Sequence, residues 1–148
     1  MNYNSVDILL VEDNMDDAEL TMLELKRHKL TNNLIHVTDG EEALEFIFAT
    51  GKYDGKREVG ITPKLVLLDI KMPKVNGIEV LQQIKSDART KSMPVVMLTS
   101  SKEDPDIKQC YEYGANSYIV KPVNFEGFAR SIMNLGFYWL LLNQPPVK

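Results

Sequence analysis

The 148-residue chain contains a single cysteine, Cys110, so it cannot form an internal disulfide. A chain without disulfides fits a reducing compartment, and we expect a cytoplasmic protein. No apolar run approaches the roughly 20 residues that a membrane-spanning helix needs, so no membrane association is expected. The N-terminal segment MNYNSVD has neither a basic stretch nor a long apolar one, which argues against a signal peptide.

The chain also lacks an excess of positive charge. Its 17 lysines and arginines are outnumbered by 21 acidic residues, and the net charge of −4 argues against a nucleic-acid-binding surface. With 44% hydrophobic and 26% charged residues and no internal repeat, the composition is typical of one globular domain, which we place at residues 1–148. Residues 51–63, which include Arg57, have no periodicity and are predicted to form an inserted surface loop.

What the sequence does contain is five short apolar runs separated by segments with helical spacing. The runs are Ile8–Val11, Leu34–Val37, Leu65–Leu68, Val95–Leu98 and Tyr118–Val120. Three of them are continuous rather than alternating, which is typical of strands covered on both faces. After the first run, apolar residues recur every three or four positions, at Met15, Ala18, Met22 and Leu25. Five alternations of strand and helix predict an α/β fold with a parallel sheet and helices on both faces.

Polar residues follow four of the five runs. The first run leads into Glu12 and Asp13, the third into Asp69, the fourth into Thr99 and the fifth into Lys121. Because parallel strands end at one edge of a sheet, where ligands bind, we expect these five side chains to converge. Each one alone would be read as an ordinary cap or turn residue. Five of them at one edge are difficult to explain by the ordinary polar character of surface loops.

The chemistry of such a cluster is restrictive. Two carboxylates ~4 Å apart repel each other by about 4 kcal/mol at an effective dielectric constant near 20. A hard divalent cation relieves this repulsion, and carboxylates with a backbone carbonyl and waters suit Mg²⁺. With the hydroxyl of Thr99 and the ammonium of Lys121, the site is suited to phosphoryl oxygens. Asp69, on the central strand, is then a candidate nucleophile that forms an aspartyl phosphate.

The motifs that contain these residues resemble the receiver domain of two-component response regulators over essentially the whole chain. The matching motifs are Leu10–Asn14, Leu67–Asp69 with Met72, Pro73 and Gly77, Leu98–Ser100, Gly114-Ala115 and Lys121-Pro122. The resemblance implies a flavodoxin-like (βα)5 fold whose strand order, 2-1-3-4-5, is carried over from the family. It also implies a cis peptide bond between Lys121 and Pro122.

The resemblance further implies a role for each residue of the cluster. Asp69 would accept a phosphoryl group from a histidine kinase or a histidine phosphotransfer protein. Mg²⁺ would be held by Glu12, Asp13, Asp69 and the backbone carbonyl of Lys71. The expected function is therefore a phosphoacceptor switch that controls a partner, and not an enzyme acting on other substrates.

Three more residues complete the implied switch. Thr99 and Lys121 would bind the phosphoryl oxygens, and the ring of Tyr118 would turn inward when Thr99 moves. The surface around the fourth helix and the fifth strand would then change shape, and a partner that prefers one of the two states would shift the population between them. Simple packing of the Tyr118 ring is the alternative for that position.

A narrower similarity, to the stand-alone receivers paired with bacterial phytochromes, is carried by Gly136–Leu140 and by the loop before the third strand. It implies a phytochrome-like kinase, no output domain and a homodimer through the fourth helix, fifth strand, fifth helix and C-terminal aromatics. Consecutive helical residues face about 100° apart, so Phe137, Tyr138 and Trp139 cannot all point inward. Some of them are expected in a dimer or kinase contact.

Two other functions remain open at this stage. One is a receiver-like scaffold that takes no phosphate. The other is a Mg²⁺-dependent phosphatase with an aspartyl nucleophile, which would generally need a second acid where the chain has Lys71. We also hypothesise that the Lys71 side chain shields an aspartyl phosphate from water and slows its hydrolysis. A solvated lysine is the alternative.

Overall fold

The computed structural model describes residues 2–28 and 33–135. The strands are β1 (Ile8–Val11), β2 (Leu34–Val37), β3 (Leu65–Asp69), β4 (Val95–Thr99) and β5 (Ser117–Val120). The helices are α1 (Met15–Arg27), α2 (Gly40–Phe48), α3 (Gly77–Ser86), α4 (Asp106–Glu112) and α5 (Phe125–Leu135), with short 3-10 helices η1 (Tyr3–Ser5) and η2 (Gly51–Tyr53). All five predicted strands are confirmed. Within the described part of the chain, no helix has the length and apolar character needed to cross a membrane.

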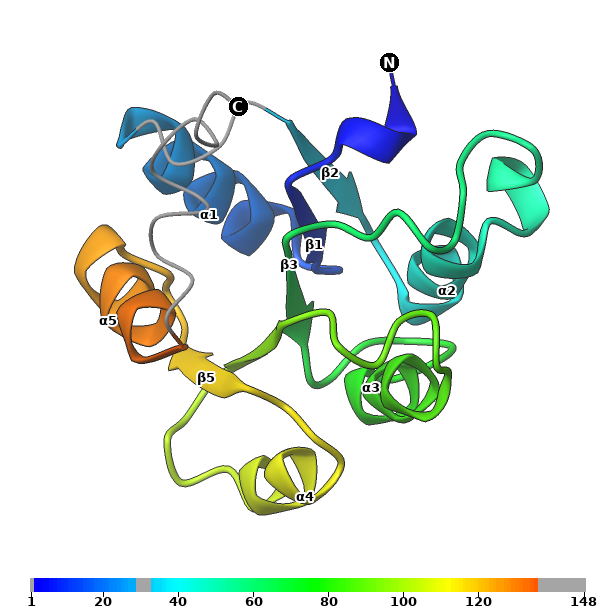
Figure 1. The fold of residues 1–148 in the computed structure, drawn as a ribbon. Helices are drawn as coiled ribbons and strands as arrows, with labels where there is room; N and C mark the ends of the chain where they lie inside the picture. The colour runs from blue at the N-terminus through cyan, green and yellow to red at the C-terminus, as the bar shows by residue number, and fades with distance from the viewer. Residues whose placement is uncertain (1, 29–32, 136–148) are drawn as a thin grey trace.

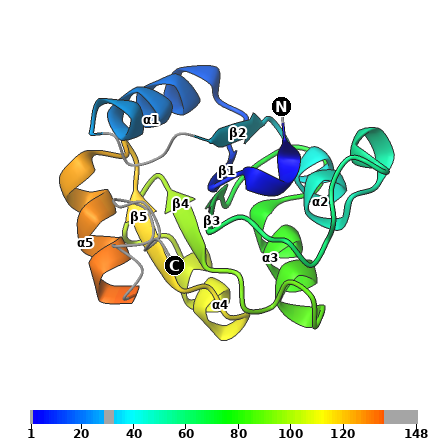
Figure 2. The same cartoon turned by 45° about the horizontal axis from the view of Figure 1, so that its top comes forward.

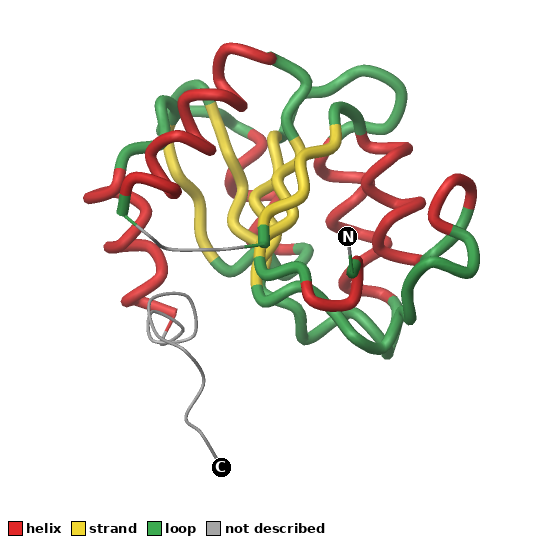
Figure 3. The backbone as a smooth tube through the Cα atoms, turned by 90° about the horizontal axis from the view of Figure 1, so that it is seen from above, coloured by secondary structure: helices red, strands yellow, loops and turns green. Residues whose placement is uncertain are grey.

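The five strands form one parallel sheet in the order β2-β1-β3-β4-β5, which confirms the predicted topology. Helices α1 and α5 cover one face of the sheet, and α2, α3 and α4 cover the other (Figures 1 and 2). In the view from above, the strands lie between the two layers of helices (Figure 3). The register pairs Val11 with Leu68 and Thr99 with Val120, so neighbouring strands end together at one edge.

The core consists of two clusters, one on each face of the sheet. Leu9, Val11 and Leu68 belong to the cluster on the side of α2 and α3, whereas Leu10 and Leu67 belong to the cluster on the side of α1. Every residue of β1, β3 and β4 is buried. This is why those runs are apolar throughout, and burial of each large aliphatic side chain contributes about 1.5–3 kcal/mol.

The buried face of α1 differs from the predicted stripe at one position. Met15 belongs to the periodic apolar stripe, but it is 52% exposed and does not join the core. It is the first residue of the helix. Thr21 is buried instead, beside Ala18 and Leu25, and its hydroxyl donates to the backbone oxygen of Asp17 at 2.8 Å. This hydrogen bond allows a polar residue to occupy a core position that an apolar pattern does not reveal.

The segment 51–63 is an inserted loop between α2 and β3, as predicted, but it is not wholly at the surface. Tyr53 is buried, and Arg57 is only 6% exposed. The guanidinium of Arg57 lies over the ring of Phe46, 4.7 Å from its centroid. It donates at 2.7 Å to the backbone oxygens of Phe46, Ile47 and Ile61. Arg57 therefore donates to carbonyl groups in the last turn of α2, where the hydrogen-bonding pattern of the helix ends.

We expect Arg57→Met to lower the free energy of unfolding by about 2 kcal/mol or more, because hydrogen bonds from a charged donor are worth about 1.5–3 kcal/mol each. Urea denaturation measures the change. Lys56→Met is the matched control, because Lys56 is an exposed neighbour of Arg57 and this substitution removes the same positive charge. Equal stabilities of the two variants would contradict this role for Arg57.

Candidate functional site

Asp69 is the last residue of β3, and its side chain reaches the edge at which the strands end. It is only 5% exposed. The chain then turns back to α3: the backbone N–H of Gly77 donates to the oxygen of Ile70 at 2.8 Å. A Cβ atom at Gly77 would collide with the backbone oxygen of Asp69, so the turn requires glycine here. The tight turn fixes the backbone that carries Asp69.

Glu12 and Asp13 follow β1, the strand beside β3. Glu12 is completely buried, whereas Asp13 is exposed. The backbone oxygen of Glu12 lies 2.8 Å from Nε2 of His36 on β2. One carboxylate oxygen from each of Glu12, Asp13 and Asp69 lies within 4.8 Å of the others. Two neighbouring strands thus bring the three predicted acids together.

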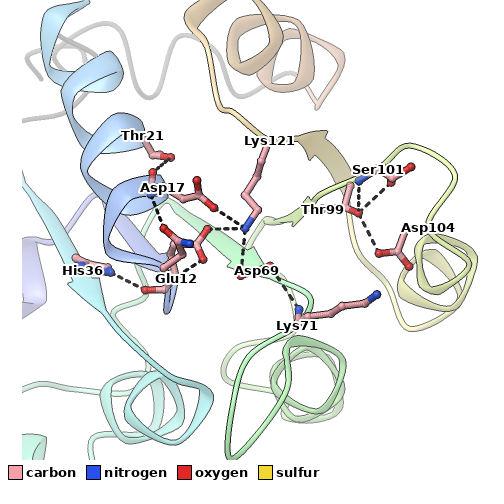
Figure 4. A network of polar contacts seen from close by, with 11 residues as sticks. Glu12, Asp17, Thr21, His36, Asp69, Lys71, Thr99, Ser101, Asp104 and Lys121 are labelled. Carbon is pink, nitrogen blue, oxygen red and sulfur yellow. Dashed lines mark hydrogen bonds and ion pairs between the residues drawn. The ribbon is translucent and has the colours of Figure 1, made fainter.

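Lys121 comes to the same place from the end of β5. Its Nζ lies 3.1 Å from Oε1 of Glu12, 3.4 Å from Oδ2 of Asp69 and 3.0 Å from Oδ2 of Asp17 (Figure 4). Its backbone N–H donates to the oxygen of Thr99 at 2.7 Å, and the bond to Pro122 is cis, as expected. One ammonium group is thus shared by three carboxylates.

The pKa values of Asp69 and Lys121 are both raised in this cluster. Burial, followed by the neighbouring Glu12 carboxylate, raises the pKa of Asp69 to about 8, although Lys121 opposes the shift. Burial alone would lower the pKa of Lys121, but hydrogen bonding to Asp17 and the charges of Asp69 and Glu12 outweigh it and raise that pKa. Lys121 therefore remains positively charged at neutral pH, and one positive charge does not neutralise the surrounding acids.

The donor set fits a hard divalent cation. A cavity of about 190 Å³ is lined by residues that include Asp13, Asp69, Lys71, Thr99 and Lys121. Three carboxylates within 4.8 Å of one another supply the oxygen ligands and the negative charge that such cations prefer. A cation bound among them would offset both effects that raise the pKa of Asp69, which are its burial and, second, the neighbouring Glu12 carboxylate.

Thr99, the last residue of β4, lines this cavity, but its hydroxyl is directed away from Asp69 (Figure 4). Its Oγ1 lies 3.0 Å from the backbone oxygen of Ser101 and 3.1 Å from Oδ2 of Asp104. Tyr118, on β5, is half-buried and packs edge-on against Tyr111, with ring centroids 6.2 Å apart. Thr99 therefore shares a cavity with Asp69 while its hydroxyl binds the loop after β4, and Tyr118 packs against Tyr111 of α4.

Sequence reasoning missed two acids in this region, Asp17 and Asp104. Asp17 lies in the first turn of α1, the helix that follows β1, and the start of such a helix lies at the edge where the strands end. Asp104 lies in the irregular segment between Thr99 and α4. Its direction depends on the loop backbone, for which the sequence carries no periodic signal.

The fold and the cluster of acids and lysine define a receiver domain, and the comparisons agree. The family model of the response regulator receiver domain matches residues 8–132, and the chain belongs to this family. It is 40% identical over 139 residues to the probable methanogenesis regulatory protein FilR2 of Methanothrix harundinacea, covering 94% of this chain and 86% of that protein. It is 35% identical to the response regulator Rcp1 of Synechocystis, and the match covers 90% of this chain and 88% of Rcp1.

Solved structures agree in fold. The bacteriophytochrome response regulator RtBRR is 49% identical, with a TM-score of 0.84 and coverage of 95% of this chain and 84% of that one. A Mn²⁺-bound form of Rcp1 is 34% identical, with a TM-score of 0.73. The phosphorylated cyanobacterial phytochrome response regulator RcpA is 32% identical, with a TM-score of 0.71. Both matches cover 96% of this chain and 99% of the other chain. The chain is thus a response regulator of two-component signalling. Receiver domains bind a divalent metal and are phosphorylated on an aspartate by histidine kinases or phosphotransfer proteins.

The raised pKa of Asp69 predicts a pH-dependent stability in the absence of divalent cations. An unfolded aspartate has a pKa near 3.9, so the folded chain binds this proton more tightly and loses stability as the pH rises from about 4 to about 8. In EDTA, Asp69→Asn should therefore be more stable than the wild type at pH 8 by more than about 1 kcal/mol, the equivalent of one pKa unit.

Urea denaturation across this pH range measures the difference, which should shrink toward pH 4. Asp54→Asn, at an exposed aspartate, serves as the control and should show no such trend. A difference between Asp69→Asn and wild type that stays constant with pH would contradict the raised pKa.

Proposed function

We propose that this response regulator is switched by phosphorylation of Asp69. The observation that carries the proposal is the position of its carboxylate, 3.4 Å from Nζ of Lys121 and within 4.8 Å of the Glu12 and Asp13 carboxylates, in a cavity open to a donor. A carboxylate oxygen of Asp69 would attack the phosphorus of a phosphohistidine. The P–N bond would break, its electron pair and a proton would go to the imidazole, and an acyl phosphate would form.

The proposed metal is Mg²⁺, held by Glu12, Asp13, Asp69 and the backbone carbonyl of Lys71. Three carboxylate oxygens are the donor set that suits this ion. When bound, Mg²⁺ would supply positive charge to the phosphoryl oxygens. Lys121 would supply a second positive charge, since its carboxylate contacts keep it protonated.

Thr99 and Tyr118 are the proposed moving parts. The phosphoryl group would add about −1.5 to −2 charges. The hydroxyl of Thr99 would turn toward the new oxygens and donate to one of them, and the Tyr118 ring would move into the space behind it. Because Tyr118 packs on Tyr111 of α4, its movement would change the surface that α4 and β5 present to a partner.

The proposed phosphodonor is a phytochrome-like histidine kinase or a phosphotransfer protein in the cytoplasm. The likeness to proteins named bacteriophytochrome and phytochrome response regulators supports this choice. We also propose that residues 1–148 act as a single receiver domain and that they dimerise through α4, β5 and α5. Three exposed apolar side chains support a dimer: Tyr111 on α4, Tyr113 directly after this helix, and Val120 on β5. The C-terminal aromatics Phe137, Tyr138 and Trp139 lie outside the described residues.

Incubation with acetyl phosphate and Mg²⁺, followed by intact-mass measurement, tests the proposal. We expect the wild type to gain the mass of one phosphoryl group, and Asp69→Asn to gain none, because an amide is not a nucleophile here. Asp16→Asn, at an exposed aspartate in the first turn of α1, should be phosphorylated like the wild type. A wild-type chain that gains no mass would favour the scaffold. Turnover of phosphate esters would favour the phosphatase.

Lys71 provides a separate prediction, because it is exposed at the mouth of the cavity, two residues after Asp69. If its side chain shields the acyl phosphate from water, Lys71→Asn should speed hydrolysis about two- to tenfold, equivalent to about 0.4–1.4 kcal/mol in the barrier. The measurement is the decay of the phosphorylated mass after removal of acetyl phosphate. Lys74→Asn is the control, because it removes the same charge from the same loop at a residue with φ of 64°, which asparagine tolerates. Equal decay in all three proteins would identify Lys71 as merely solvated.

A further inference from the structure

Asp104 contacts two parts of the proposed switch at once. Its Oδ2 lies 3.1 Å from Oγ1 of Thr99. Its Oδ1 accepts a hydrogen bond from the backbone N–H of Asp106, the first residue of α4, at 2.9 Å. The backbone oxygen of Asp104 accepts a second hydrogen bond, from the backbone N–H of Ile107, at 3.2 Å. One half-buried carboxylate thus joins the end of β4 to the beginning of α4.

The hydroxyl of Thr99 is surrounded by partners on the α4 side. The backbone N–H of Ser101 donates to Oγ1 at 3.3 Å, so the hydroxyl hydrogen faces either the backbone oxygen of Ser101 at 3.0 Å or Asp104 at 3.1 Å. An ionised carboxylate is a stronger acceptor than a neutral carbonyl. Figure 4 shows both acceptors on the side of Thr99 that faces away from Asp69.

We propose that Asp104 is a positioning residue that holds Thr99 away from Asp69 before phosphorylation and transmits its release to α4. The inference rests on the proposed function, in which Thr99 donates to the phosphoryl group. A phosphoryl oxygen must then compete with Asp104 for the single hydrogen of Thr99. When Thr99 turns, the Asp104 carboxylate loses its contact with β4 and keeps the contact with the backbone N–H of Asp106, so the beginning of α4 is no longer tied to β4 through this side chain.

The competing explanation is that Asp104 only caps α4, and the loop itself suggests a variant that separates the two roles. Ser101 makes the same kind of turn with a shorter side chain, since its Oγ accepts the backbone N–H of Glu103, two residues on, at 3.1 Å. Asp104→Ser should therefore keep the contact with Asp106 and lose the oxygen that faces Thr99. Asp104→Asn is a second variant, which keeps the shape of the side chain and replaces one acceptor oxygen by an amide.

The test is calorimetric titration of the full chain with beryllofluoride, a phosphoryl mimic, in the presence of Mg²⁺. We expect Asp104→Ser and Asp104→Asn to bind it about fivefold or more tightly than the wild type, because the hydroxyl no longer has to leave a charged acceptor. Glu103→Ser is the matched control, since it removes a negative charge from the neighbouring exposed residue and should bind like the wild type.

A Thr99→Val background separates positioning from simple electrostatics. If Asp104 acts through the Thr99 hydroxyl, Asp104→Ser should have no effect on beryllofluoride affinity in that background. A gain that persists there, or an equal gain in Glu103→Ser, would overturn the inference by pointing to charge alone. Unchanged affinity in both Asp104 variants would also overturn it, while leaving the proposed function intact. Equal binding by the wild type and Asp69→Asn would instead overturn both.

Discussion

The mutual repulsion of Glu12, Asp13 and Asp69 is the constraint on which the site depends. Their oxygens lie within 4.8 Å of one another, and two of the three side chains are buried. Burial and the neighbouring Glu12 carboxylate raise the pKa of Asp69, and the ammonium of Lys121, 3.4 Å away, offsets them only in part. The crowding that makes these charges costly to hold together is also what suits the site to a divalent cation, and a cation there would in turn favour a charged phosphoryl group.

The fold separates parts that are fixed from parts that can move. The acids sit at the ends of β1 and β3, whose residues are wholly buried, and a glycine-dependent turn fixes the backbone after Asp69. Such preorganisation keeps the charges in place without reorganisation during phosphoryl transfer. Thr99 differs, because its hydroxyl is bonded to the β4-α4 loop. A hydroxyl that exchanges partners between loop and phosphoryl group can link the chemistry to α4.

Much of this arrangement is readable from the sequence. Continuous apolar runs identified the strands, and polar residues at their ends identified the converging acids, although the strand order came from the family resemblance. Asp17 and Asp104 were not predicted, because their roles depend on the direction of single side chains. Arg57 was taken for part of a surface loop, since nothing in its neighbours reveals that its guanidinium binds the end of α2. Met15 shows the reverse error, a periodic apolar residue that remains exposed at the start of a helix.

The most direct test of the shared cation site is a titration with Mn²⁺ followed by electron paramagnetic resonance, comparing the wild type with Glu12→Gln, Asp13→Asn and Asp69→Asn. We expect one site in the wild type and an affinity lower by about tenfold or more in each variant, because each would lose a charged oxygen ligand. The control Asp16→Asn should bind like the wild type. Unchanged affinity in any of the three variants would contradict a single cation held by acids from both strands.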